Sequence, residues 1–287
     1  MSEAETANLY CVSHKPVVTS SESVCVLQVG NATDTFATYR DNTGDNIAPL
    51  NANFSELTGH YWVWKNRPAT TVGFCHYRRF LIPGIATDWL TVNASQPYKG
   101  RPPFGIGNYA SGYFADKHTL NTRLTQLDYG RELRNELENH DILLPKHNPV
   151  MEGGLIRQYG RAHPIEPFYA MLAAIAKIDN DMGKQALTFF TEHEYAHWNN
   201  LYYTHWDVFD AYCKFQFDVL LSLVSNERSF NDPYQNRYCA FLSERLLNFW
   251  VWHSKLKVKQ LDWCMTEDLE QATDSHQRVV GRKAANS

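Results

Sequence analysis

Several short motifs that mark common protein classes are missing from this 287-residue sequence. The six cysteines form no CxxC pair and no zinc-ribbon spacing, so they are expected to be reduced, mostly buried thiols rather than zinc ligands. No GxGxxG follows the first expected strand, and no GxxxxGK occurs anywhere. These absences disfavour dinucleotide binding and P-loop phosphate binding.

Long apolar runs and a strong charge excess are also missing. No stretch approaches the roughly 20 apolar residues that a membrane helix needs, and the acidic start of the chain has no signal-peptide pattern. The net charge of -4 provides no general attraction to nucleic acid. We therefore expect a cytoplasmic protein without a nucleic-acid partner, in which any anionic ligand is held by local cations.

Apolar and aromatic residues are plentiful. The hydrophobic content of 44% and the length of 287 residues suffice for a well-buried core, and they predict one domain over residues 1–287. The 8 Trp and 16 Tyr are also suited to stacking on sugars and bases, although a core position explains any one ring equally well.

Residues 41–80 contain the densest group of turn-forming, aromatic and cationic side chains. The run DNTGDN at residues 41–46 is typical of a loop. Ser55 is the expected N-cap of an aromatic-rich helix that ends before the helix-breaking Pro68. A β-branched run at residues 70–74 then predicts a buried strand.

A cationic group follows directly on that strand, in the order Cys75, His76, Tyr77, Arg78 and Arg79. Neighbouring arginines on a surface are more often solvated than functional. Here, however, they come at the carboxyl end of a strand, where open α/β sheets bind their ligands. The position therefore favours a binding site.

The order of the remaining elements predicts a mostly parallel α/β sheet flanked by helices. Residues 82–120 have little periodicity and predict an irregular insertion. Residues 151–160 contain paired glycines and predict a loop that a ligand could approach closely. The chain from residue 266 onward predicts a polar tail. Further strands are expected at residues 9–13, 24–30, 141–145 and 201–204, and further helices at residues 122–139, 167–178, 207–223 and 241–252.

The segment HEYAH, from His193 to His197, matches the HExxH motif of zinc proteases. That motif requires a helix, on which the two histidines share a face and bind one metal ion. The strand expected at residues 201–204 begins shortly after the second histidine. A zinc hydrolase is therefore a disfavoured alternative.

Several sequence blocks together resemble a bacterial glycosyltransferase family, long known only as a domain of unknown function and found in capsule and O-antigen gene clusters. This family includes the galactofuranosyltransferase domain of bifunctional O-antigen polymerases. The resemblance covers nearly the whole chain, and its main blocks are DNTGDNI, ELTGHYWVWKN, CHYRRF, DILLPK and DPYQNRYCAFLSERLLNFW.

The resemblance implies a GT-A-like fold and transfer of a hexose from a UDP-sugar, with galactofuranose as the suggested sugar. The acceptor would be a glycan or lipid-linked glycan of a growing capsule or O-antigen. It also implies donor contacts, for each of which a purely structural role is the alternative: His14, Asp41, Asn46, Glu56, Trp64, Arg78, Arg79 and Asn200.

Many GT-A enzymes place a metal-binding DxD motif directly after a central strand, where this chain has His76, Tyr77, Arg78 and Arg79. Guanidinium groups bind phosphate oxygens bidentately and supply the positive charge that a metal ion otherwise provides. We therefore predict a metal-independent enzyme without a cofactor, in which Arg78 or Arg79, aided by His76, stabilises the departing diphosphate.

Glu244 is the predicted general base of an inverting transfer, because it is the only carboxylate in the block FLSERLLNFW. An apolar setting would raise its pKa toward neutrality. The alternative is that Glu244 pairs with Arg78 or Arg245 and only orients it, in which case His76 or Asp207 would be the base.

Two further expectations concern the function as a whole. The alternative to an enzyme is a non-catalytic nucleotide-sugar or carbohydrate binding module on the same fold. Lys255, Lys257 and Lys259 form a small basic cluster that predicts weak, peripheral contact with an anionic membrane, at about 1 kcal/mol per residue. A solvated strand with alternating lysines is the competing interpretation.

Overall fold

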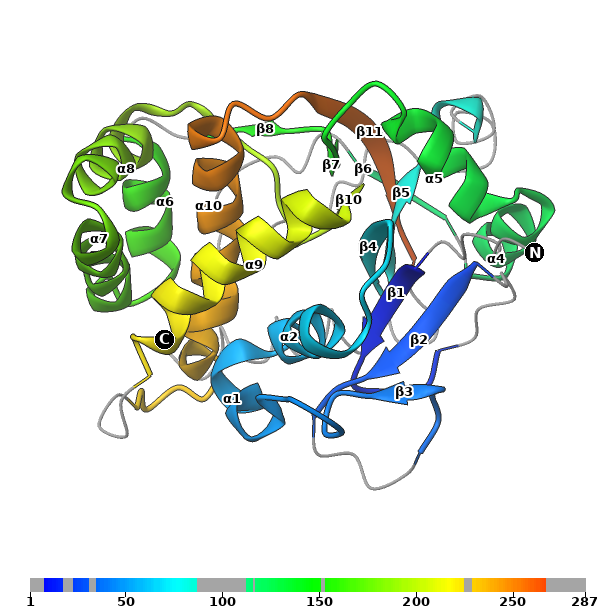
Figure 1. The fold of residues 1–287 in the computed structure, drawn as a ribbon, viewed down its shortest axis with the longest axis horizontal. Coiled ribbons are helices and arrows are strands. Elements are labelled where there is room, and N and C mark those ends of the chain that lie inside the picture. The colour runs from blue at the N-terminus through cyan, green and yellow to red at the C-terminus, as the bar shows by residue number, and fades with distance from the viewer. Residues whose placement is uncertain are drawn as a thin grey trace, which may run out of the picture.

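The computed structural model describes residues 8–17, 23–30, 35–86, 112–115, 117–150, 153–224 and 229–266. Helices pack around a nine-stranded sheet, which confirms the α/β class (Figure 1). The strands of this sheet are β1 (Asn8–Ser13), β2 (Val24–Gln28), β3 (Tyr39–Arg40), β4 (Thr71–His76), β5 (Arg79–Ile82), β6 (Gly112–Phe114), β7 (Ile142–Pro145), β10 (Tyr202–His205) and β11 (Val258–Met265).

The sheet is mixed rather than mostly parallel. Strands β3, β2, β1 and β4 are parallel neighbours in that order, as expected. Beyond β4 the pattern changes, because the turn at Tyr77 and Arg78 reverses the chain into β5 and because β10 pairs antiparallel with both β4 and β7. The expectation of a mostly parallel sheet was wrong because it did not include the short turn between β4 and β5.

One edge of the sheet collects the carboxyl ends of several strands. Strands β1, β2 and β4 are parallel, and β7 runs in their direction because both β4 and β7 pair antiparallel with β10. The start of β10 lies at the same edge, since Tyr202 pairs with Phe74 near the end of β4. Residues that follow these strands, or precede β10, therefore meet there.

The helices differ in what they cover. In Figure 1, α4 and α5 lie at the β5 and β6 side of the sheet, α2 and α9 lie beside β4, and α6 to α8 form an outer group beside α10. The helices are α1 (Asn51–Phe54), α2 (Leu57–Asn66), α4 (Lys117–Gln126), α5 (Tyr129–Leu137), α6 (Gly154–Ala162), α7 (Glu166–Ile178), α8 (Asn180–Glu192), α9 (Trp206–Leu221) and α10 (Tyr238–His253). None of these helices, within the described ranges, is long and apolar enough to cross a membrane.

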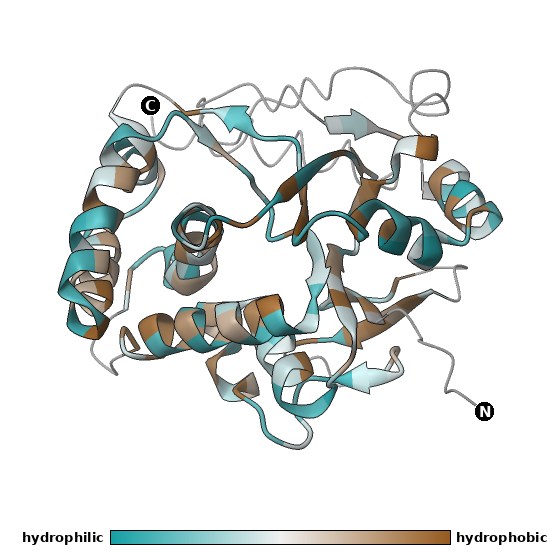
Figure 2. Ribbon diagram, turned by 45° about the horizontal axis from the view of Figure 1, so that its top comes forward, coloured by the Kyte–Doolittle hydropathy of each residue, from teal (hydrophilic) through white to brown (hydrophobic). Residues whose placement is uncertain are grey.

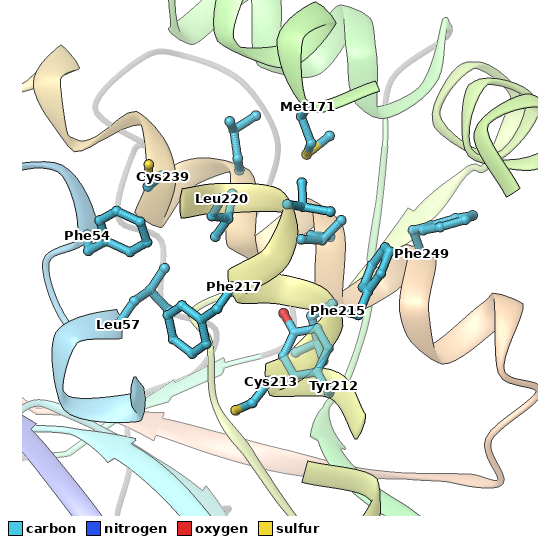
Figure 3. Close-up of a cluster of buried hydrophobic side chains, with 14 of the residues drawn as sticks. Phe54, Leu57, Met171, Tyr212, Cys213, Phe215, Phe217, Leu220, Cys239 and Phe249 are labelled. Atoms are coloured by element: carbon cyan, nitrogen blue, oxygen red, sulfur yellow. The ribbon is translucent and has the colours of Figure 1, made fainter. Parts of the chain in front are cut away.

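Alternating side chains of the sheet enter two separate cores. In β4, Val72 and Phe74 belong to the larger core, while Cys75 belongs to the smaller core under α4 and α5. The larger core is rich in aromatic rings, and Figure 3 shows Phe217 and Leu220 of α9 between α10 and the α1–α2 segment. Figure 2 shows hydrophobic residues along the central strands and alternating hydropathy along the outer helices.

Two local expectations were wrong. The helix expected at residues 122–139 is two helices, because Asp128 interrupts it and caps α5 by accepting a hydrogen bond from the N–H of Arg131. The segment at residues 151–160 contains the start of α6 rather than a loop. A Cβ at Gly154 would lie 2.5 Å from the carbonyl oxygen of Phe190, so this glycine allows close approach to the chain's own backbone rather than to a ligand.

The expected insertion at residues 82–120 is only partly within the described residues. Strand β5 ends at Ile82, and β6 and the beginning of α4 also fall inside the expected insertion. Residues 87–111 lie outside the described part, as does the expected tail after Thr266. The strands expected around residues 9–13, 24–30, 70–74, 141–145 and 201–204 are confirmed, as are the helices expected near 167–178, 207–223 and 241–252.

Candidate functional site

A cluster of aromatic and cationic side chains lies at the carboxyl ends of β1 and β4. His14 follows β1, His76 ends β4, and Arg79 opens β5 directly opposite His76. The ring of Tyr77 lies 4.0 Å from that of His76 and 5.5 Å from that of His14, centroid to centroid. The structure thus brings together the residues that the sequence placed at the ends of these two strands.

The two histidines of this cluster are neutral at neutral pH. Burial lowers the pKa of His76 well below its usual value, and Arg79 and Arg78 lower it further. The pKa of His14 is lowered first by burial and then by Lys15 and Arg237. The positive charge of the site therefore comes from the arginines, and His76 is a weak candidate for a general base.

Arg237 enters the same site from the opposite end of the sequence. It is the N-cap residue of α10, and its guanidinium donates from Nε to Oγ of Ser55 at 2.7 Å. Ser55 has a φ of +49° and does not cap α2, so the predicted N-cap role was wrong. A cation at a helix N-terminus is disfavoured by the helix dipole. Its presence here adds positive potential at the start of α10.

Glu56 links Asn200 to Arg237, through a hydrogen bond on one side and an ion pair on the other. The amide Nδ2 of Asn200 donates to Oε1 of Glu56 at 2.9 Å, and Oε2 of Glu56 lies 3.9 Å from a terminal nitrogen of Arg237. Ser243 of α10 donates to Oδ1 of Asn200 at 3.2 Å. Two expected donor contacts, distant in sequence, are therefore held next to each other at the sheet edge.

Glu244 lies one residue further along α10 and remains partly open to solvent, with 23% of its side chain exposed. Its Oε1 accepts from the backbone N–H of Asn199 at 3.1 Å, and its Oε2 accepts from Arg245 at 3.0 Å. Burial raises the pKa of Glu244, Glu56 raises it further, and Arg245 and Arg79 act in the opposite direction. The carboxylate is therefore oriented and retains a raised pKa.

Arg245 is held in place by several contacts within the protein. It is buried, and besides Glu244 it donates to the carbonyl oxygen of Phe241 at 2.7 Å and to Oε1 of Gln158 at 2.8 Å. Its guanidinium also lies 4.8 Å from the ring centroid of Trp198. These contacts hold the Nη1 edge of the guanidinium against Glu244, so the ion pair with Arg245 that was considered as an alternative for Glu244 is present.

Asp41 follows β3 at the same edge and is almost fully buried. Its Oδ2 makes no hydrogen bond within the described part of the chain. Burial raises the pKa of Asp41, while hydrogen bonds with Thr58 and the backbone of Gly30 lower it. A buried carboxylate oxygen without a partner at a ligand-binding edge is the arrangement expected of a donor contact.

Two other expected donor contacts serve local structure. Asn46 caps its own turn, since its Oδ1 accepts from the N–H of Ala48 and its Nδ2 donates to the carbonyl of Gly44. The indole N–H of Trp64 donates to Asp210 at 2.6 Å, and its ring stacks on Phe217. Trp64 is eight residues from Glu56, which corresponds to about 12 Å along α2 at 1.5 Å per residue.

The HEYAH segment does not have the geometry of a zinc protease. His193 ends α8, and Tyr195–Ala196 form strand β9, which pairs with β8 (Asn148–Pro149), so the two histidines do not share a helical face. Nδ1 of His197 lies 2.6 Å from the carbonyl oxygen of Pro145. Across the described ranges, no group of three or more His, Cys, Asp or Glu is arranged to hold a metal ion.

The sequence did not single out Arg237, Tyr234 or Asn199. Tyr234 is close enough to Arg237, Glu244 and Arg79 to be influenced by their charges, although burial is the main cause of its raised pKa. The available signals were that Arg237 and Tyr234 belong to the block at residues 232–250, and that an arginine begins an apolar helix where a cation is disfavoured.

Comparison with known proteins identifies the family of the chain. Residues 8–255 match the family described as Domain of unknown function DUF4422, and the chain belongs to this family. A solved apo structure of WbbM, described as a bifunctional glycosyltransferase, is similar with a TM-score of 0.68 and 27% identity over 92% of this chain. The match covers 46% of the WbbM chain, so this protein spans less than half of that length. No curated protein matches.

Proposed function

We propose that this DUF4422 protein is a glycosyltransferase that takes its sugar from a nucleotide diphosphate donor. The observation that carries the proposal is the convergence of arginines and the partly exposed Glu244 at the carboxyl edge of the sheet. Arg79 lies opposite His76 at the end of β4, and Arg237 pairs with Glu56. Asn200 binds Glu56, and the neighbouring Asn199 binds Glu244. Cations suited to a diphosphate thus lie beside a carboxylate with a raised pKa. The similarity to a bifunctional glycosyltransferase supports the same class of reaction.

The arginines and the start of α10 would hold the diphosphate. Guanidinium groups bind phosphate oxygens bidentately and stabilise the charge that develops as the diphosphate departs. Arg237, as the N-cap residue of α10, brings its charge to this end of the helix. Asp41, at the end of β3, would contact the nucleoside side of the donor. UDP-galactofuranose is the proposed donor.

Glu244 would act as the general base of an inverting displacement. It takes the proton of the acceptor hydroxyl as the hydroxyl oxygen forms a bond to the anomeric carbon. The bond from that carbon to the diphosphate oxygen breaks at the same time, and the nucleoside diphosphate leaves with the electron pair. Arg245 and the N–H of Asn199 fix the carboxylate during this step, and its raised pKa favours proton acceptance near neutral pH.

The proposed reaction needs no metal ion, because Arg78 and Arg79 occupy the position after the central strand where related folds place DxD. The proposed acceptor is a glycan of a growing capsule or O-antigen. Incubation of the purified protein with a panel of nucleotide sugars, with and without excess EDTA, tests the proposal. Slow donor hydrolysis or transfer that persists in EDTA is expected. If the protein turns over no nucleotide sugar, the proposed enzymatic function is refuted. If activity is lost in EDTA and restored by manganese, the proposed metal independence is refuted.

A further inference from the structure

A cavity of about 340 Å³ lies near the C-terminal end of α10. Its walls come from the segments after β7 and before β10 and from α10 itself, and they include His147, His193, Tyr195, His197, Asn248 and Trp252. We call it the α10 cavity. Its volume is within the range of pockets that bind small molecules, and the proposed donor chemistry does not use it.

Two residues that line the α10 cavity lie on the same face of α10 as the proposed catalytic carboxylate. Asn248 is four residues after Glu244 and Val251 is seven, a spacing that places them on the same stripe of α10. Trp252 is eight residues after Glu244, or about 12 Å along the helix axis. Figure 1 shows α10 extending from beside α1 to beside β8, so one helix links the two regions.

The loop before β10 ties the cavity to the site more directly. Asn248 donates from Nδ2 to the carbonyl oxygens of His197 and Glu244, and its Oδ1 accepts from the N–H of His197. Asn199, two residues after His197, donates from its backbone N–H to the carboxylate of Glu244. The same short segment therefore shapes one wall of the cavity and orients the proposed base.

The lining combines exposed aromatic rings with groups that pair with hydroxyls. Trp252 and Tyr195 line this cavity, and each residue is 45% exposed overall, so part of each ring is accessible to a ligand. Burial lowers the pKa of His197 to about 4 and also lowers that of His193, so both rings are neutral at neutral pH. A neutral imidazole has one donor and one acceptor nitrogen, so it matches a sugar hydroxyl, which also donates and accepts.

We propose that the α10 cavity binds a sugar residue of the acceptor glycan, with Trp252 stacking on its apolar face and His147 and His193 pairing with its hydroxyls. This inference rests on the proposed function, because the bound sugar is an acceptor only if the protein is a glycosyltransferase. A bound sugar in the cavity would lie a short distance along the glycan from the hydroxyl that reaches Glu244. The cavity thereby sets which chain end is presented to the donor. A metal ion is not the proposed occupant, since the described residues provide no set of three ligands for one.

Titration calorimetry with defined oligosaccharides that contain galactose, glucose, mannose or glucuronic acid tests the inference without any nucleotide. The wild-type protein is expected to bind at least one of them, and Trp252→Ala is expected to weaken that binding at least tenfold. Tyr195→Ala is a second variant at an exposed position and should weaken it in the same direction. Tyr169→Ala, which removes a 56% exposed tyrosine on α7, is the matched control and should bind as the wild type does.

A parallel titration with UDP separates this inference from the proposed function. Unchanged UDP affinity in Trp252→Ala, together with lost oligosaccharide binding, is the expected pattern. If oligosaccharide binding depends on Trp252 but the protein does not bind UDP, the cavity is still a sugar-binding site. The proposed transferase function is then refuted. The inference is overturned if the wild type binds none of the oligosaccharides, or if both cavity variants bind them as tightly as the wild type.

Discussion

Arg245 donates a 3.0 Å hydrogen bond to Oε2 of Glu244, its neighbour on α10. The arginine is buried, while the carboxylate keeps 23% of its surface exposed. The attraction lowers the pKa of Glu244, yet burial outweighs it and the pKa stays above the ordinary value. Orientation by an arginine and action as a base are therefore compatible in this residue, although the sequence suggested a choice between them.

Replacement of Glu244 by Gln keeps the shape of the side chain and removes its basicity. Turnover should fall by about a hundredfold or more, the scale on which a general base contributes, while UDP affinity holds. In the wild type, the acidic limb of the pH–rate profile should lie above the pKa of about 4.3 of an ordinary glutamate, because burial raises the pKa of Glu244. Weakened UDP binding with turnover largely kept would show that Glu244 only supports the phosphate site.

Arg237 should contribute to donor binding although it lies far from Arg79 in the sequence. Arg237→Ala removes a guanidinium near His14 and His76 and should weaken UDP affinity at least tenfold. Arg131→Ala removes an arginine that is 59% exposed on α5 and is the matched control, with unchanged affinity expected. Equal UDP affinity in the Arg237→Ala variant and the control would place Arg237 outside the donor site.

We expect Asp41 to lower the stability of the folded protein at neutral pH while it contributes to donor binding. Burial raises its pKa in the folded state, so the stability it contributes is present below the unfolded value of about 3.9 and is lost as the pH rises through the folded pKa. Asp41→Asn should therefore raise the melting temperature at pH 7, with a difference that shrinks toward pH 3, and should weaken UDP binding. A variant that is less stable than the wild type at pH 7 would contradict this account.

Membrane contact, if it follows from the basic cluster, should be electrostatic. Lys259 forms an ion pair with Glu136, while Lys255 and Lys257 are exposed near the end of α10. The protein should sediment weakly with anionic vesicles at low salt and dissociate as salt screens the charges. Retention at high salt would require an apolar mode of attachment instead.

Much of the fold was predictable because its elements have clear local patterns. Strand β7 is buried throughout its four residues, and α10 is a continuous helix in which most residues are buried and apolar. The antiparallel half of the sheet was not predictable, since the turn at Tyr77 and Arg78 has no glycine or proline to mark it. The start of α6 was missed because paired glycines are typical of loops, whereas here they allow α6 to approach α8.

The site was predictable where a strand end marked it, as at His14 and His76. It was less predictable where contacts join distant segments: Ser55 and Arg237 are far apart in the sequence, yet their side chains are hydrogen-bonded. For Trp64 the sequence left both roles open, because an aromatic residue in a family block is equally suited to packing, and in the structure its ring stacks on Phe217 of α9. Sequence spacing alone carries no information about such tertiary contacts.

Titration of UDP into the wild-type protein and into Arg79→Ala, both in excess EDTA, tests most directly the claim that arginines at the end of β4 hold a nucleotide diphosphate. Wild-type protein should bind without metal, and Arg79→Ala should lose at least tenfold in affinity and about a hundredfold in turnover with little change in melting temperature. Equal UDP affinity in the two folded proteins, or no binding of UDP to either, would contradict the account.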